Sequence, residues 1–147
     1  MPLNTILLVE DNPDDEALTL RALNTNNLLN KVIVARDGQE AVDYLFGEGQ
    51  YSDRDAAITP ALILLDLQLP KIDGFGVLKR LRSNSLTKLL PVVILTSSVE
   101  QEDVLSGYGL GANSFVRKPV DFEHFIDIVS QIGPYWLLLN QRPESTA

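Results

Sequence analysis

Short apolar runs recur along this 147-residue chain, with room for a helix between one run and the next. Each run is too short for a helix, is rich in branched side chains and does not alternate with polar residues, as expected for a parallel strand covered on both faces. A more polar fifth run, Ser114–Arg117, suits the edge of a sheet. The first four runs are residues 6–9, 32–35, 62–65 and 92–95.

The segments between the runs have helical spacing and characteristic helix starts. Strands that alternate with helices predict one α/β domain, a doubly wound parallel sheet with helices on both faces. We expect the fourth helix to be weak because three glycines follow closely, and Gly133-Pro134 to kink or stop the fifth helix. The expected helix starts are Asn12 before Pro13, Asp37 with Glu40, Gly74, Ser98 with Gln101, and Asp121.

The composition limits the classes of function. Twelve basic and 20 acidic residues give a formal net charge of −8, which opposes broad contact with nucleic acid or an anionic membrane. The chain has no cysteine, which excludes disulfides, thiolate zinc sites and cysteine nucleophiles. Because it lacks both a signal-peptide pattern and an apolar run of about 18 residues, we expect a cytoplasmic protein that binds neither nucleic acid nor membrane.

Polar residues follow the apolar runs at the same end of the predicted strands. Glu10 and Asp11 follow the first strand, Asp66 the third, Thr96 the fourth and Lys118 the fifth. The carboxyl ends of parallel strands lie along one edge of a sheet, where folds of this kind form their binding sites. We therefore expect these five side chains to converge in one shallow cleft.

Three carboxylates in one cleft call for a positive charge. Like charges about 4 Å apart repel by about 4 kcal/mol per pair at an effective dielectric constant near 20. An all-oxygen site with few protein ligands favours Mg²⁺ over Ca²⁺. Lys118 adds a second cation beside Asp66, and Thr96 offers a hydroxyl donor. Such a set is typical of in-line phosphoryl transfer to a carboxylate nucleophile.

Four segments together resemble the receiver domain of two-component response regulators. They are ILLVEDNPDD, LILLDLQLPKIDG, VVILTSS and FVRKP, and the resemblance extends over residues 4–132. It implies a flavodoxin-like fold with strand order 2-1-3-4-5. It also implies a signalling protein without enzymatic turnover, which accepts a phosphoryl group from the phosphohistidine of a sensor histidine kinase.

The resemblance also assigns roles to single residues. Asp66 is implied as the phosphoacceptor, and Asp11 and Asp66 as direct Mg²⁺ ligands, joined by the backbone carbonyl of Gln68, with Glu10 acting through water. Thr96 and Phe115 fall at the family's switch pair, a hydroxyl that moves toward the phosphoryl group and an aromatic ring that follows it. The bond between Lys118 and Pro119 is similar to one that is cis in the family.

A narrower resemblance is carried by the opening EDNPDDEALTLRAL, the long segment after the second helix and the tail YWLLLN. These resemble stand-alone regulators that partner phytochrome-type histidine kinases. We accordingly expect one receiver domain over residues 1–147, with residues 133–147 as an extension and no output domain. The apolar tail either folds back or pairs with a second copy, and we favour a homodimer through the fourth helix, fifth strand, fifth helix and tail.

Two other functions are considered. An aspartyl-phosphate hydrolase carries a second Asp two residues after its nucleophile, where this chain has Gln68. A pseudo-receiver would keep the fold as a binding module without phosphorylation, which the five competent site positions argue against. We interpret His124 as a solvated helix residue, residues 47–60 as a surface loop, and the basic residues around the third helix as solvent-facing charges, namely Lys79, Arg80, Arg82 and Lys88.

Overall fold

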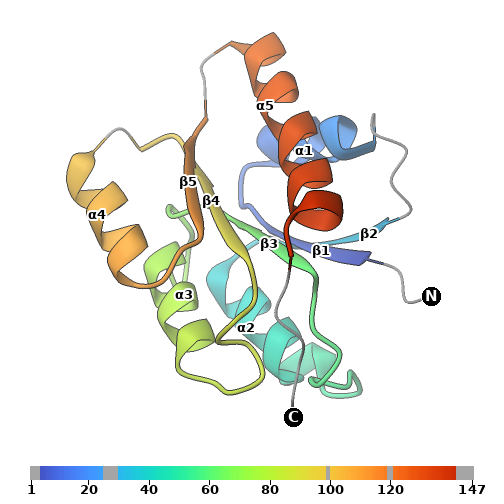
Figure 1. The fold of residues 1–147 in the computed structure, drawn as a ribbon. Helices are drawn as coiled ribbons and strands as arrows, with labels where there is room; N and C mark the ends of the chain where they lie inside the picture. Colours follow the sequence, from blue (N-terminus) through green and yellow to red (C-terminus); the bar gives the residue numbers. More distant parts are fainter. Residues whose placement is uncertain (1–3, 25–29, 99, 119–120, 142–147) are drawn as a thin grey trace.

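The computed structural model describes residues 4–24, 30–98, 100–118 and 121–141. A five-stranded parallel sheet lies at the centre, in the order β2-β1-β3-β4-β5, which confirms the predicted topology (Figure 1). The strands are β1 (Asn4–Val9), β2 (Asn30–Ala35), β3 (Leu62–Leu65), β4 (Val92–Thr96) and β5 (Ser114–Arg117). The helices are α1 (Pro13–Asn24), α2 (Gly38–Phe46), α3 (Gly74–Arg82), α4 (Gln101–Gly109) and α5 (Phe122–Pro134), with a 3-10 turn at Gly49–Tyr51 and a π-helical turn at Tyr135–Leu139.

The unbroken apolar runs of the central strands are explained by cores on both faces of the sheet. On β1, Leu7 and Val9 pack toward α2 and α3, whereas Ile6 and Leu8 pack toward α1 and α5. Every residue of β3 and β4 is buried. Figure 1 shows α1 and α5 together on one side of the sheet and α2, α3 and α4 on the other. The sheet therefore holds its carboxyl edge rigidly.

Side-chain caps define most of the helix starts. Asn12 Oδ1 accepts hydrogen bonds from the amides of Asp14 and Asp15 at 2.9 and 3.1 Å, and the Asp37 and Asp121 carboxylates cap α2 and α5 as predicted. The prediction that Ser98 caps the fourth helix is wrong. The residue before α4 is Glu100, and the Ser98 hydroxyl donates to Asp103 instead, so that it binds a side chain of the first turn.

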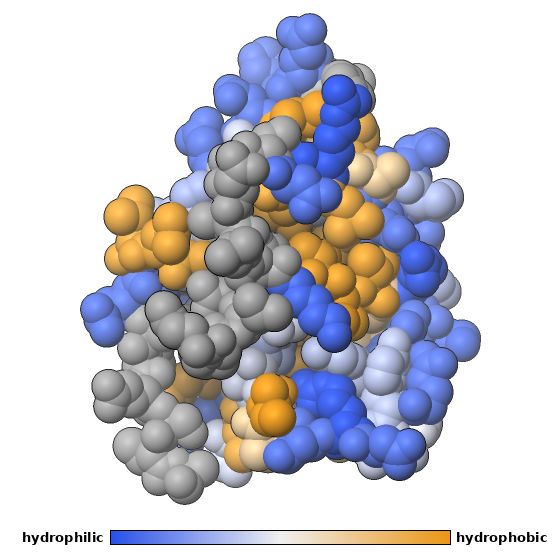
Figure 2. All heavy atoms as spheres, turned by 90° about the vertical axis from the view of Figure 1, so that its right-hand side faces the viewer, coloured by the Kyte–Doolittle hydropathy of each residue, from blue (hydrophilic) through white to orange (hydrophobic). Residues whose placement is uncertain are grey.

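The helix does not stop at Gly133-Pro134 but changes its hydrogen-bonding period there. Pro134 has no backbone N–H to donate. The Tyr135 amide nevertheless donates to the carbonyls of Gln131 and Ile132, and a π-helical turn follows. Trp136 and Leu137 pack against the core beside α1 and α5, whereas Leu138 and Leu139 are 63% and 75% exposed. The tail thus folds back in part. Figure 2, which looks onto the right-hand side of Figure 1, shows apolar residues at the surface, bordered by hydrophilic residues.

The loop of residues 47–60 lies at the surface, as predicted, and is tied to α2. The Tyr51 hydroxyl donates to Glu40 Oε2 at 2.7 Å, and the Arg54 guanidinium lies 4.0 Å from the centre of the Tyr44 ring. None of the helices in the described part of the chain is long and apolar enough to cross a membrane.

The interpretation of the basic residues around α3 as solvent-facing charges is wrong for Arg82. Lys79, Arg80 and Lys88 are exposed, but Arg82 is half-buried. Its guanidinium donates to the carbonyls of Gly111 and Lys88 at 2.9 and 3.0 Å, and its other donors reach the Thr87 carbonyl and Asn113 Oδ1. Burial lowers the pKa of this guanidinium. Sequence periodicity places the residue on an outer face but does not reveal these acceptors.

Replacing Arg82 by Gln should destabilise the protein, because it leaves partly buried carbonyls without their donor. We expect a loss of about 1–3 kcal/mol in the free energy of unfolding, measured in urea. Arg80→Gln on the same helix is the matched control, since the Arg80 side chain is 52% exposed and its ion pair with Glu48 is 3.5 Å long. An equal effect of the two substitutions would show that Arg82 has no special structural role.

Candidate functional site

Backbone hydrogen bonds continue the sheet for one residue beyond the strands and so place the acidic side chains together. The amides of Glu10, Asp66 and Lys118 donate to the carbonyls of Ala35, Val9 and Thr96 at 2.9, 3.1 and 2.7 Å. Carboxylate oxygens of Glu10, Asp11 and Asp66 lie within 4.8 Å of one another. The predicted convergence of these acids at the carboxyl edge is thus observed.

One buried ammonium joins the cluster. Lys118 Nζ lies 2.5 Å from Glu10 Oε1 and 2.9 Å from Asp66 Oδ2, and it also lies 2.9 Å from Asp15 Oδ2. Asp15 is not among the site residues predicted from the sequence, where it follows the helix-start residues Asn12 and Pro13. Its position five residues after Glu10, in a helix that begins at this same edge of the sheet, is the signal that would have found it.

Burial determines the electrostatics of the site. The side chains of Glu10, Lys118 and Asp66 are 2%, 6% and 9% exposed. Desolvation raises the pKa of Glu10 to about 7, although the hydrogen bond and charge of Lys118 act in the opposite direction. Burial alone would lower the pKa of Lys118, but Glu10, Asp66 and Asp15 together outweigh it and raise that pKa above its usual range. Lys118 is therefore a fixed positive charge.

The loop after β3 orients Asp66. The Gln68 amide donates to Asp66 Oδ1 at 3.2 Å, so that both carboxylate oxygens have a defined partner. The loop returns tightly, since the Gly74 amide donates to the Leu67 carbonyl at 2.9 Å. A Cβ atom at Gly74 would lie 2.3 Å from the Asp66 carbonyl oxygen, which leaves space for glycine only.

An open pocket of about 450 Å³ gives access to this cluster. Asp11, Asp66 and Lys118 line it, together with Asp15. Glu10 lies beneath, where its Oε2 accepts from the Asn12 amide at 3.2 Å. The pocket therefore presents carboxylates and one ammonium to an incoming polar group. Its full lining is Asp11, Asn12, Pro13, Asp15, Asp66, Gln68, Ser97 and Lys118.

The predicted switch residues lie beside the pocket rather than in it. Thr96 is fully buried, its Oγ1 accepts from the Ser98 amide at 3.4 Å, and Ser97 lines the pocket in its place. Phe115 pairs with Ile94 in the sheet, on the same face as Thr96, and is partly buried. A Cβ atom at Gly107 would lie 3.1 Å from the Phe115 ring, so α4 packs directly against it. The bond between Lys118 and Pro119 lies outside the described residues.

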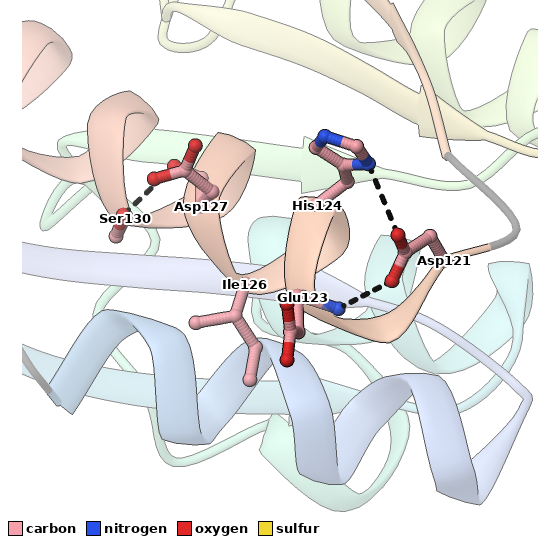
Figure 3. Close-up of a pocket in the computed structure, with 6 residues that line it drawn as sticks. All are labelled: Asp121, Glu123, His124, Ile126, Asp127 and Ser130. Atoms are coloured by element: carbon pink, nitrogen blue, oxygen red, sulfur yellow. Dashed lines mark hydrogen bonds and ion pairs between the residues drawn. The ribbon is translucent and has the colours of Figure 1, made fainter.

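A second hollow lies along α5 and differs in kind from the acidic pocket (Figure 3). Its titratable groups are all exposed, and Asp121 uses its carboxylate to accept from the Glu123 amide and to pair with His124 Nδ1 at 3.3 Å. His124 is 71% exposed, in line with its interpretation as a solvated residue. This hollow is a helix flank with its cap and presents no buried charge.

The family model that describes the response regulator receiver domain matches residues 6–130. The chain belongs to the response regulator receiver family. The matched residues contain all five strands except the first two residues of β1, as well as each site residue described above. The receiver fold thus accounts for the position of the acidic cluster at the carboxyl edge of the sheet.

Individual receivers are similar to this chain over most of its length. Response regulator Rcp1 of Synechocystis sp. is 38% identical over 136 residues, with 92% of this chain and 90% of Rcp1 covered. The structure of Mn²⁺-bound Rcp1 has a TM-score of 0.89 at 36% identity, covering 96% and 99% of the two chains. The phosphorylated cyanobacterial phytochrome response regulator RcpA gives 0.90 at 37% identity, covering 97% and 100%. The bacteriophytochrome response regulator RtBRR gives 0.77 at 47% identity, covering 99% and 87%.

The raised pKa of Glu10 should make this receiver less stable as the pH rises. The folded state holds the Glu10 proton more tightly than the unfolded chain, so this stabilisation is complete below about pH 4.5 and is lost as the pH passes about 7. With divalent ions chelated, the loss should be about 2 kcal/mol between roughly pH 5.5 and roughly pH 7.5. Glu10→Gln should remove this slope in urea unfolding, whereas Glu123→Gln, at an exposed position, should keep it. Equal slopes in wild type and Glu10→Gln would contradict the assignment.

Proposed function

We propose that this protein is a phosphorylation-dependent response regulator in which Asp66 accepts the phosphoryl group. The observation that carries the proposal is the Asp66 carboxylate, which lines the pocket while it contacts the buried Lys118 ammonium and the Gln68 amide. In the proposed step an Asp66 oxygen forms a bond to phosphorus as the P–N bond of a phosphohistidine breaks. The electron pair of the broken P–N bond stays on the imidazole nitrogen, which takes up a proton.

We propose Mg²⁺ as the cofactor, and the donor set fits it. The clustered oxygens belong to carboxylates alone, a hard set suited to a hard cation. Asp11 and Asp66 would ligate the ion directly with the backbone carbonyl of Gln68. Glu10 would act through water, since its side chain is only 2% exposed and does not line the pocket. When bound, the ion would offset the phosphoryl charge. The similar protein Rcp1 has a Mn²⁺-bound form, which supports a divalent ion as cofactor.

We propose that Thr96 and Phe115 transmit the phosphorylation state. Phosphorylation turns the single negative charge of Asp66 into roughly two, which draws hydroxyl donors. Thr96 lies one residue from the pocket-lining Ser97, and Phe115 lies on its face of the sheet against α4. A movement of the Thr96 hydroxyl toward the phosphoryl group would open space for the Phe115 ring and change the surface of α4, β5 and α5.

The proposed partners are a sensor histidine kinase of the phytochrome type and a second copy of this chain. The names of RcpA and RtBRR, which refer to phytochromes, support the kinase class. A homodimer would cover apolar side chains of α4 and the tail, where Leu105 is 65% and Leu139 is 75% exposed. The net charge of −8 opposes contact with nucleic acid and with anionic membrane surfaces, so the proposed partners are proteins. The proposed location is the cytoplasm.

Two outcomes would favour other functions. A pseudo-receiver would keep the fold and leave Asp66 unmodified, and a phosphatase would turn over small phosphate esters. The second is disfavoured because Gln68, two residues after Asp66, offers no acidic proton. The proposed protein is a phosphoacceptor rather than an enzyme with an external substrate.

Incubation with acetyl phosphate and Mg²⁺ should add one phosphoryl group to the intact protein, measured by mass spectrometry. Asp66→Asn should abolish the gain because the acceptor oxygen is lost, and EDTA should slow it strongly. Asp53→Asn, an equal charge change in an exposed loop, is the control and should be phosphorylated like wild type. A wild-type protein that gains no mass would support the pseudo-receiver.

Thr96→Ala should leave phosphorylation largely intact and remove its effect on self-association. We expect wild type to dimerise more tightly when phosphorylated, in sedimentation velocity runs, and Thr96→Ala to dimerise equally in both states. Ser85→Ala removes an exposed hydroxyl outside the pocket lining and should behave like wild type. A persistent difference in Thr96→Ala would refute the relay, and a monomer in both states would refute the homodimer.

A further inference from the structure

The Lys118 ammonium has no hydrogen-bond donor to spare. An ammonium carries three N–H donors. Each has an acceptor within 2.9 Å, namely Glu10 Oε1, Asp15 Oδ2 and Asp66 Oδ2. The side chain is only 6% exposed, which limits exchange of these acceptors for water. A phosphoryl oxygen that is to bind Lys118 must therefore replace one of the three carboxylates.

Burial distinguishes the three acceptors. Glu10 is 2% exposed, and loss of Lys118 would leave a buried carboxylate without its counter-ion. Asp66 is 9% exposed and would carry the phosphoryl group itself. Asp15 is 30% exposed, so water can hydrate its carboxylate when the ion pair opens. Its place in the first turn of α1 also stabilises a negative charge without a partner. Asp15 is the acceptor that is replaced at the lowest cost.

Asp15 also faces the space that a phosphoryl group on Asp66 would enter. Both carboxylates line the same pocket, and both contact Lys118 Nζ at 2.9 Å, Asp15 from α1 and Asp66 from the end of β3. An incoming group with nearly two negative charges meets Asp15 as a like charge and as a rival for one N–H donor. Removing the carboxylate would relieve both effects.

We propose that Asp15 is a positioning residue that competes with the phosphoryl group for the Lys118 ammonium. This inference rests on the proposed function of Asp66. In the unphosphorylated protein Asp15 occupies one donor of Lys118, and the phosphoryl group takes that donor by displacing it. Asp15 thereby opposes phosphorylation and sets how tightly the site holds its anion.

The test measures the affinity for beryllofluoride, a phosphoryl mimic, at saturating Mg²⁺ by fluorine NMR. Asp15→Asn should bind it more tightly, by roughly threefold or more, because the competing ion pair is lost. Asp14→Asn is the matched control, since Asp14 is the neighbouring exposed acid outside the pocket lining and loses the same charge. Asp15→Glu restores a carboxylate and should return the affinity toward that of wild type. Phosphorylation by acetyl phosphate should be faster in Asp15→Asn than in Asp14→Asn.

Several results would overturn the inference. Equal gains in Asp15→Asn and Asp14→Asn would reduce the effect to net charge, and weaker binding in Asp15→Asn would mean that Asp15 helps Lys118 to meet the anion. Failure of Asp15→Glu to restore the affinity would assign the effect to helix structure. In each case wild type still binds beryllofluoride and is phosphorylated, so the proposed function stands. A wild-type protein that does neither would overturn both.

Discussion

The attraction between one buried ammonium and three carboxylates governs the functional end of this molecule. Lys118 follows the edge strand β5, Glu10 and Asp66 follow the central strands β1 and β3, and Asp15 lies on the first turn of α1. Without the ammonium, these acids would repel one another at a nearly dry site. The contact therefore ties four separate elements into one arrangement, which the proposed divalent ion and phosphoryl group would change.

The sheet makes this arrangement possible by fixing the backbone from which the acids project. The amides of Glu10, Asp66 and Lys118 extend the ladder beyond the strands, so their positions are set by hydrogen bonds to buried neighbours. The apolar layers on the two faces of the sheet leave little freedom to adjust. The proposed change on phosphorylation would then fall on side chains and on α4, whose Leu105 and Tyr108 are exposed.

Much of this could be predicted from the sequence, because runs such as residues 62–65 and the polar residues after them follow from simple periodicity and from the geometry of parallel sheets. Contacts between elements could not. Asp15 looks like an ordinary helix-start acid and Arg82 like a surface charge, and each has a partner far away in the sequence. Ser98 looks like a cap, but its hydroxyl donates to the Asp103 side chain instead. Pro134 is a different case: the rule that proline kinks or stops a helix does not consider that the next amide, that of Tyr135, can still donate to carbonyls of the preceding turn. Side-chain partners of this kind depend on packing angles that periodicity does not encode.

The tight return at Gly74 has a consequence for anyone who maps this protein by saturation mutagenesis. A side chain there would meet the Asp66 carbonyl and the Leu67 backbone before it touched any ligand. Nearly every substitution should displace the acceptor loop, and an activity screen would rank the position beside the chemically active residues. A mutational map of this receiver would therefore include positions such as Gly74 that are essential for the shape of the site but take no part in its chemistry.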